Sequence, residues 1–275
     1  MTSFHAVYLL RNGNPLSWTR RFLRSYARTR VPTDVSLILL LKGFEDGKPS
    51  KEVDALLEKL NIKAESFAVS DEGYDLEAYR KIVQAFPDKS LLFLNSHSEL
   101  LHKTALEDFQ TAVRNLGEEA LIGASGSWEC PAHFGLAFPN PHIRTTGFLA
   151  RAQDYLEACK GHDLTTKGGC HAFESGPQSL THWFKTNNRP VAVVTKGGES
   201  YPTDKWPQSR TFRLAHQENL LIGDNRSRKY QVGTRKRRRH HATHSWGDYS
   251  AISNTGLASF LKRNIMERLK QLGWL

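Results

Sequence analysis

The chain has 275 residues, of which 39% are hydrophobic, and it contains six Trp, eight Tyr and fourteen Phe. This composition excludes a largely disordered polypeptide, and the length fits one α/β domain with an added segment. Lys and Arg number 38 against 28 Asp and Glu, which gives a formal charge of +10. Eight of the 38 lie between Arg226 and Gly247, so the other 30 leave only +2 elsewhere, and the local excess indicates a phosphate-bearing partner or surface.

The cysteines and the N-terminus bear on the cellular compartment. Cys130, Cys159 and Cys170 are too few and too widely spaced for a disulfide framework or a zinc site. We find no signal peptide and no run of about 18 apolar residues. These observations predict a cytoplasmic protein in a reducing compartment.

The first half of the chain alternates between strand and helix patterns. Strands are expected at 5–11, 35–43, 64–70, 91–94 and 120–125, and helices from Asn14-Pro15 onwards and at 50–60, 74–86 and 103–115. The run VSLILLLKG is continuously apolar, which is typical of a strand covered on both faces. Short connections between alternating elements predict an α/β fold with a mostly parallel, Rossmann-type sheet and helices on both faces.

The alternation ends after residue 125. One more strand is expected at 191–198, whereas 199–255 reads as irregular, with the basic tract TRKRRRHH as a loop within it. Residues 256–275 have the apolar stripe of an amphipathic helix. We therefore expect two halves of one domain, 1–125 and 126–255, followed by a C-terminal helix.

Polar side chains follow each strand of the first half. Ligands of open parallel sheets bind beyond the carboxyl ends of the strands. Carboxylate and amide groups suit the base and ribose of a nucleotide, and basic groups suit its diphosphate. Each residue alone is an ordinary polar loop end, but five strand ends together favour a nucleotide site. The candidates are Arg11, Asn12, Lys42, Asp71, Asp75, Asn95, Ser96 and His97.

Two features of the second half carry further candidates. Glu174, in KGGCHAFESGPQSLTHWF, precedes an expected helix, where the helix dipole would keep a carboxylate ionised and able to accept a proton. The alternative is a capping glutamate without chemistry. A second group of cations would stabilise a diphosphate leaving group, unless it is simply a solvated basic loop. It comprises Arg210, Arg213, Arg226 and Lys229.

Ten blocks in order connect the chain to a known family. They are YLLRNGNPLSWTRRFLRSY, LLLKGF, SDEGYDLEAYRK, FLNSHS, LIGASGSWE, NPHIRTTGFLA, FESGPQSLT, SRTFR, ENLLIGDNRSRKY and WGDY. With these blocks the chain resembles bacterial family-2-like glycosyltransferases, which have the GT-A nucleotide-sugar fold and are often met near polysaccharide loci. The resemblance implies that 1–125 binds the donor and that 126–255 is the acceptor and catalytic half.

The resemblance also gives the strand end at 95–97 a meaning. In GT-A enzymes this position carries an Asp-x-Asp motif that grips the ribose and a divalent metal, but here it is Asn95-Ser96-His97. His97 is left as a candidate metal ligand, although Mg²⁺ prefers oxygen ligands. Three alternatives stay open: Asp71 and Asp75 help to hold Mg²⁺ or Mn²⁺, arginines and lysines replace the metal, or activity has been lost.

The same resemblance assigns the second half. Glu174 looks like the catalytic base of an inverting, hexosyltransferase-like enzyme, with His142 and Arg144 on the acceptor side. Trp246 is either a sugar platform or lid, or a core tryptophan. The expected acceptor is a glycan or glycolipid.

The basic tract and the C-terminal helix suggest a further partner. Both could contact an anionic membrane on its inner face, and nothing indicates sequence-specific nucleic-acid binding. Two non-enzymatic alternatives also remain, namely a catalytically silent binder of nucleotide sugars or glycans and a basic binder of phosphate polymers.

Overall fold

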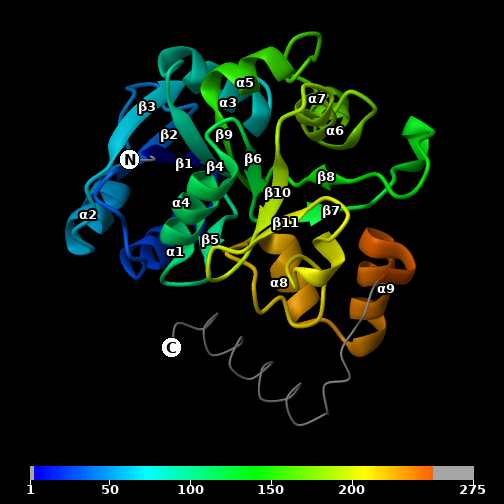
Figure 1. Ribbon diagram of the computed structural model, residues 1–275. Coiled ribbons are helices and arrows are strands. Elements are labelled where there is room, and N and C mark those ends of the chain that lie inside the picture. Colours follow the sequence, from blue (N-terminus) through cyan, green and yellow to red (C-terminus); the bar gives the residue numbers. More distant parts are fainter. Residues whose placement is uncertain (1–2, 250–275) are drawn as a thin grey trace.

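An eight-stranded mixed sheet forms the centre of the computed structural model, which describes residues 3–249 (Figure 1). Its strands are β1 (Phe4–Arg11), β2 (Val35–Lys42), β3 (Glu65–Val69), β4 (Ser90–Leu94), β6 (Leu121–Gly123), β9 (Gly147–Arg151), β10 (Val191–Val194) and β11 (Ser200–Pro202). Their order is β11-β10-β6-β9-β4-β1-β2-β3. The pairs β1–β2, β2–β3, β1–β4 and β6–β10 are parallel, which confirms the expected mostly parallel α/β sheet.

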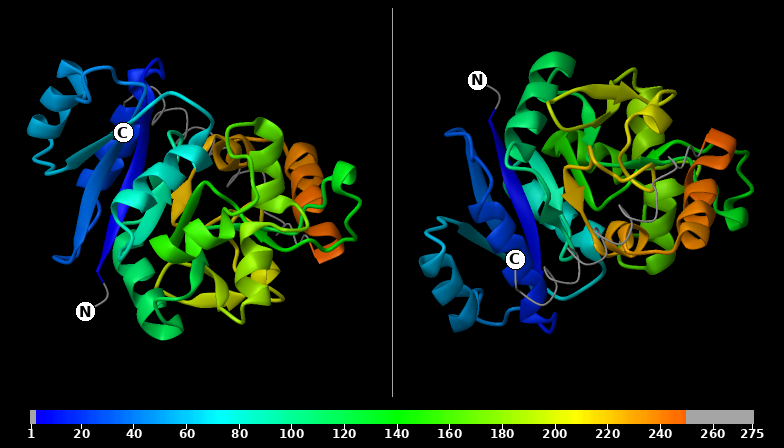
Figure 2. Two further views of the ribbon diagram at one scale, coloured as in Figure 1. Left: turned by 90° about the horizontal axis from the view of Figure 1, so that it is seen from above. Right: turned by 90° about the horizontal axis from the view of Figure 1, so that it is seen from below.

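Helices cover both faces of the sheet, as the alternating patterns predict (Figure 2). One face carries α3 (Asp75–Ala85), α5 (Ala152–Ala158), α6 (Lys167–Ser175) and α7 (Leu180–Thr186), and the other carries α1 (Leu16–Ala27), α2 (Lys51–Lys59) and α4 (Ala105–Leu116). Side chains of β1 alternate between the two cores: Val7 and Leu9 face the first, and Tyr8 and Leu10 face the second. Burial on both sides explains why these strands are continuously apolar.

Strand β9 is the main departure of the sheet from the sequence prediction. It lies in the middle of the sheet and runs antiparallel to both β4 and β6. Its first residue, Gly147, pairs with Leu94, the last residue of β4. The segment just before β9 therefore arrives at the same edge where β4 ends.

The basic tract is helical, so the prediction of a loop over 234–241 is wrong. Helix α9 (Arg235–Trp246) begins after Thr234, whose side chain accepts a hydrogen bond from the amide of Arg237. Arg and Lys are good helix formers, and Arg238, Ala242, Ser245 and Trp246 bury one side of the helix. The preceding helix, α8 (Asn225–Gln231), was also not expected.

Short elements complete the described part. The strand β5 (Glu99–Leu100) pairs with β12 (Ile222–Gly223), and β7 (Gly126–Ser127) pairs with β8 (His142–Ile143). Single turns of 3₁₀ helix are η1 (Ala132–Phe134), η2 (Trp206–Gln208) and η3 (Gly247–Tyr249).

The two expected halves share one sheet, because β9 of the second half lies between β4 and β6 of the first, and β10 and β11 extend the sheet beyond β6. The predicted C-terminal helix 256–275 lies outside the described residues. Within residues 3–249, none of the helices has the length and apolar character needed to cross a membrane.

Candidate functional site

Three predicted site residues meet at the carboxyl ends of β1, β2 and β3. The Arg11 guanidinium donates two hydrogen bonds to the Asp71 carboxylate, over 2.7 and 2.8 Å, and the Lys42 ammonium donates another over 2.9 Å. Lys42 is only 2% exposed, whereas Arg11 and Asp71 are open to solvent. The hydrogen bond from Arg11 is the main reason that the pKa of Asp71 lies well below its ordinary value, and Lys42 adds to it. Asn12 continues from Arg11 on the exposed loop, and its amide donates to the Lys42 carbonyl.

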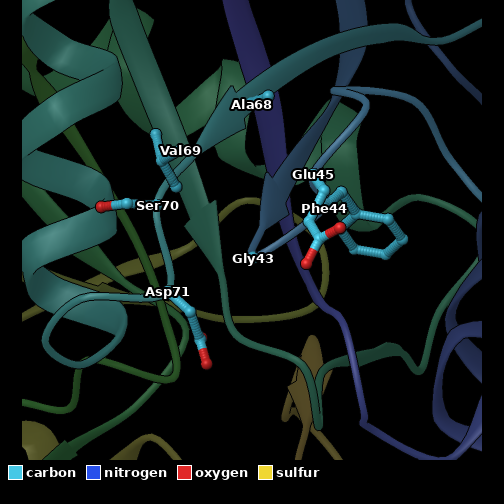
Figure 3. Close-up of a pocket in the computed structure, with 7 residues that line it drawn as sticks. All are labelled: Gly43, Phe44, Glu45, Ala68, Val69, Ser70 and Asp71. Atoms are coloured by element: carbon cyan, nitrogen blue, oxygen red, sulfur yellow. The ribbon is translucent and has the colours of Figure 1, made fainter.

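A pocket of about 410 Å³ lies beside Asp71, between the ends of β2 and β3 (Figure 3). It is lined by Gly43, Phe44, Glu45, Ala68, Val69, Ser70 and Asp71. Gly43 has φ +75°, and a Cβ there would lie 2.9 Å from the Cβ of Asp71, so only glycine lets the two strand ends approach this closely. An aromatic ring from Phe44 and a carboxylate from Asp71 thus border one hollow that opens at the sheet edge.

The residues Asn95, Ser96 and His97 form a tight turn after β4. The Asn95 side-chain oxygen accepts from the amide of His97 at 3.0 Å and from the Ser98 hydroxyl at 3.2 Å. The Ser96 hydroxyl donates to the Leu9 carbonyl at 3.0 Å. The polar side chains of Asn95 and Ser96 therefore brace the turn against β1.

His97 is held by neighbours from two helices. Its ring lies 4.0 Å, between centroids, from the ring of Trp18 on α1, and its carbonyl accepts from Arg228 on α8. Partial burial lowers the pKa of His97, and the nearby Arg228 lowers it further. A neutral imidazole is therefore the expected form at neutral pH.

Asp75 connects the donor residues to Glu174. It begins α3 and is close enough to Lys42 and to Glu174 for both charges to act on it. Burial raises its pKa to about 6, with repulsion from Glu174 as the second cause. Asp75 is therefore close both to Lys42, which contacts Asp71 and lies at the end of β2, and to Glu174 of α6.

This placement of Asp75 predicts a pH-dependent penalty on folding. A carboxyl whose pKa rises from 3.8 to about 6 on folding costs nothing below pH 4, and the cost grows as pH rises towards 6. Asp75→Asn should raise the free energy of unfolding at pH 7.5 by up to about 3 kcal/mol, and at pH 3.5 it should change little. Urea unfolding at the two pH values measures this, and Asp54→Asn, exposed on α2, is the control. An equal effect of Asp75→Asn at both pH values would contradict it.

Glu174 occupies the last turn of α6, so the expectation that it stands at a helix entry is wrong. Thr166 caps α6 by accepting from the amide of Gly169, and the helix continues through Phe173 to Ser175 despite two glycines. The next helix begins only at Leu180. Glu174 therefore lies at the negative end of a helix dipole. It is held instead by Thr145, whose hydroxyl donates to one carboxylate oxygen at 3.1 Å and whose amide donates to the other at 3.4 Å.

A small cleft of about 50 Å³ contains Glu174 and the two predicted acceptor-side residues. Its lining is almost wholly polar: Ser127, Glu129, Pro131, His142, Arg144, His171, Glu174, Ser175 and Arg226. Burial lowers the pKa of His142, partly offset by Glu174. His142 and Arg144 thus lie where the resemblance placed them, beside Glu174.

The segment before β9 ties this cleft to the turn after β4. The carbonyl of Thr146 accepts from the amide of Asn95 at 3.3 Å and from the hydroxyl of Ser98 at 2.9 Å. Its neighbour Thr145 holds Glu174. Thr146, which contacts the turn after β4, and Thr145, which contacts the Glu174 carboxylate, are thus consecutive residues. Glu174 is therefore on the same side of the molecule as Asn95.

Asp224 is a site residue that the sequence prediction missed. It is 2% exposed, and it accepts from Arg144 at 2.8 Å and from the Thr146 hydroxyl at 3.0 Å. It also caps α8 through a reciprocal pair of hydrogen bonds with Ser227. Its spacing from Ser227, three residues, was the available signal.

Glu129 was also missed, and it balances charge at the cleft. It lies 2.9 Å from His244 and 3.9 Å from Arg213. Burial alone would raise its pKa, but His244 and Arg213 outweigh burial and lower it. Nothing in the sequence near Glu129 distinguishes it from an ordinary surface glutamate.

The four predicted diphosphate-binding residues separate in the structure. Arg226 lines the cleft, and Lys229 is exposed on the same helix, close enough to His97 to affect its pKa. Arg213 is buried against the Phe212 ring and donates to Ser245, and burial lowers its pKa to about 10. Arg210 is exposed and pairs with Glu218 at 3.0 Å, and it does not line the cleft.

Trp246 is not a lid, and its assignment to the acceptor site is wrong. It has no exposed surface, and its indole nitrogen donates to the Phe212 carbonyl at 2.8 Å. Trp246 is the last residue of α9, and its buried ring packs in the hydrophobic core, so it cannot cover a sugar.

The residues at the turn after β4 do not fit a divalent cation held by the protein alone. The Asn95 oxygen already accepts two hydrogen bonds, and Ser96 donates to the backbone. Among residues 3–249 no group of three or more His, Cys, Asp or Glu could hold a metal ion. The roles of His97, Asp71 and Asp75 as ligands of Mg²⁺ or Mn²⁺ remain predictions.

Comparison with known proteins gives similarity at the level of solved structures. No protein-family model and no curated protein matches the chain. The chain is similar in fold to TarS from S. aureus in complex with UDP-GlcNAc, with 11% identity, a TM-score of 0.46 and coverage of 96% of this chain and 73% of that one. The chain is also similar in fold to mouse xyloside xylosyltransferase 1, with 13% identity, a TM-score of 0.42 and coverage of 68% of this chain and 81% of that one.

Both TM-scores are below 0.5. The chemistry proposed below comes from the residues of this chain.

Proposed function

We propose that this protein transfers a sugar from a nucleotide-sugar donor to a hydroxyl group of a glycan or glycolipid, with Glu174 as the general base. The observation that carries the proposal is the arrangement at one sheet edge. There, Thr146 contacts the turn of Asn95 while its neighbour Thr145 holds Glu174. Donor-type and base-type residues therefore border one region.

The donor side fits a nucleotide in its chemistry. The pocket between β2 and β3 offers the Phe44 ring to a base, and Asp71, fixed by Arg11 and Lys42, offers carboxylate oxygens to ribose hydroxyls or base amides. Arg226 lines the cleft with Glu174, and Lys229 lies near His97, so we assign these two cations of α8 to the diphosphate. Fixed cations of this kind stabilise the charge that develops on a leaving diphosphate.

The transfer step uses Glu174 directly. The acceptor hydroxyl oxygen bonds to the anomeric carbon, and its proton passes to the Glu174 carboxylate. The bond between the anomeric carbon and the diphosphate oxygen breaks, and its electron pair leaves with the diphosphate. A single displacement of this kind inverts the anomeric centre. No step of this scheme passes through a metal.

A catalytically silent binder of nucleotide sugars is the second candidate. It is favoured by the replacement of the Asp-x-Asp carboxylates and by the engagement of Asn95 and Ser96 in bracing their turn. The two candidates share the donor site and differ only in whether Glu174 turns substrate over.

Donor binding is tested by calorimetry with nucleoside diphosphates and nucleotide sugars, each with and without Mn²⁺. Asp71→Asn keeps the shape of the side chain but removes the charge, and it should weaken the best ligand about 10- to 100-fold, since hydrogen bonds to charged groups contribute about 1.5–3 kcal/mol. Asp54→Asn, exposed on α2, is the matched control. Lack of binding by the wild-type protein to every nucleotide would refute both candidates.

A further inference from the structure

The helices α1, α8 and α9 are connected by a series of contacts, with α8 between the other two, although α1 is far from both in sequence. Helix α1 contacts β5, β5 pairs with β12, β12 contacts α8, and α8 contacts α9. The three helices lie along the lower side of the molecule in Figure 1. Trp18 of α1 and Arg228 of α8 both contact His97, which fixes the two helices around the same turn.

These helices hold an unusual share of the positive charge. The segments 12–33 and 225–247 together contain 13 Lys and Arg and no acidic residue. Elsewhere 25 Lys and Arg face 28 Asp and Glu, which is a formal charge of −3. The excess charge of the whole chain thus belongs to α1, α8, α9 and their flanks. We call this the basic surface, and its exposed cations are Arg20, Arg24, Arg28, Arg30, Arg226, Lys229, Arg235, Lys236, Arg237 and Arg239.

The charges of α9 are arranged against the stability of the helix itself. Its first turn contains Arg235, Lys236 and Arg237 and no acidic residue, although the first turn favours negative charge. An anionic partner at this end would remove that cost. The arrangement therefore indicates a binding function, since folding alone does not require it.

Exposed apolar side chains accompany the cations. Leu101, which follows β5, is 42% exposed, Val232 between α8 and α9 is 39% exposed, and Tyr249 beyond α9 is 61% exposed. Basic residues beside exposed aliphatic and aromatic side chains suit the boundary of an anionic bilayer, where phosphates meet acyl chains. A surface for nucleic acid bases would instead interleave large aromatic residues with the cations, and α9 has no Phe, Tyr or Trp between Arg235 and Ser245.

We propose that the basic surface formed by α1, α8 and α9 docks the protein onto an anionic lipid bilayer. Arg226 belongs to α8 and lines the cleft that contains Glu174. Docking would therefore bring this cleft to the lipid surface, within reach of a lipid-linked acceptor. The docking itself does not depend on the proposed glycosyl transfer.

Co-sedimentation of the full chain with vesicles tests the proposal. The protein should bind vesicles that contain phosphatidylglycerol, should not bind vesicles of phosphatidylcholine alone, and should dissociate as NaCl is added. Lys236→Gln/Arg237→Gln/Arg239→Gln should weaken binding on the order of a hundred-fold, because each basic residue at the surface contributes about five-fold. Circular dichroism checks that α9 remains helical in this variant.

The matched control is Lys51→Gln/Lys59→Gln/Lys63→Gln, which removes three exposed charges on and just after α2 and should leave vesicle binding unchanged. Arg20→Gln/Arg24→Gln/Arg28→Gln should weaken binding as the α9 variant does, and an unchanged affinity would overturn the part played by α1. If the α9 variant and the control lose vesicle affinity equally, the assignment of binding to the basic surface is overturned. Binding to duplex DNA without binding to the anionic vesicles would overturn the lipid assignment.

Discussion

Glu174→Gln is expected to slow glycosyl transfer by about 10²- to 10⁴-fold while the donor nucleotide still binds. A glutamine keeps the size of the side chain, and its amide oxygen can still accept a hydrogen bond from Thr145. It cannot take the proton of the acceptor hydroxyl, so only the chemical step should be affected. Initial rates of sugar transfer, together with calorimetry of donor binding, measure the two effects separately.

Glu157→Gln is the matched control for this variant. Glu157 is an exposed residue of α5 that pairs with Lys160, away from the cleft residues, and its replacement should leave both rate and affinity unchanged. Unchanged turnover in Glu174→Gln would remove the assigned base. Donor binding without any turnover by the wild-type protein would leave the silent binder as the better account. Joint loss of turnover and donor affinity would make Glu174 a binding residue instead.

The second large effect is expected on stability. Asp224→Asn should lower the free energy of unfolding by about 3–5 kcal/mol, because it leaves the Arg144 guanidinium buried without its counter-charge. Burial alone would raise the pKa of Asp224, but Arg144 and the amide of Ser227 outweigh it and hold the pKa well below the ordinary value. The contribution of this carboxylate is therefore present above about pH 4 and is lost as pH falls through the depressed pKa.

Urea unfolding at pH 7 measures this loss, with the exposed Asp88→Asn as control. Because Arg144 lines the cleft and also lies 3.7 Å from the centroid of the Phe212 ring, a smaller change in stability would indicate that the ring and solvent already compensate its charge. A decrease in the free energy of unfolding below about 1 kcal/mol is typical of an exposed ion pair. It would contradict the stabilising role assigned to the buried Arg144–Asp224 pair.

The first half of the fold could be predicted because its physical signals are local. Each buried parallel strand is a continuous apolar run, and each helix between strands has its own apolar stripe, as in Val35–Lys42 followed by Lys51–Lys59. The polar residues after those strands could be grouped because parallel strands end at one edge. The meeting of Arg11, Lys42 and Asp71 follows from that rule.

The second half depends on contacts that are distant in sequence. Strand β9 is five residues long, and its place between β4 and β6 is decided by pairing with both of them. Helix α9 has almost no apolar periodicity, so its sequence does not indicate a helix. Only the structure shows that Arg238 and Trp246 are buried on one side of it. The spacing of Asp224 from Ser227 indicates a helix cap, but its place in the site depends on Arg144 and Thr146, about 80 residues away in the sequence.

The approach of β9 to the sheet has a consequence for how the proposed sugar transfer could diversify. Thr145 and Thr146 are consecutive, and their Cα atoms are about 3.8 Å apart in any trans peptide. Covalent geometry therefore fixes the spacing between the residue that holds Glu174 and the residue that contacts the turn of Asn95. Inserting one residue here would shift β9 by one position and exchange the sides of its buried residues. New acceptor preferences should therefore arise by changes in the loop 128–141, which borders the cleft at Glu129 and Pro131, and not within 144–147.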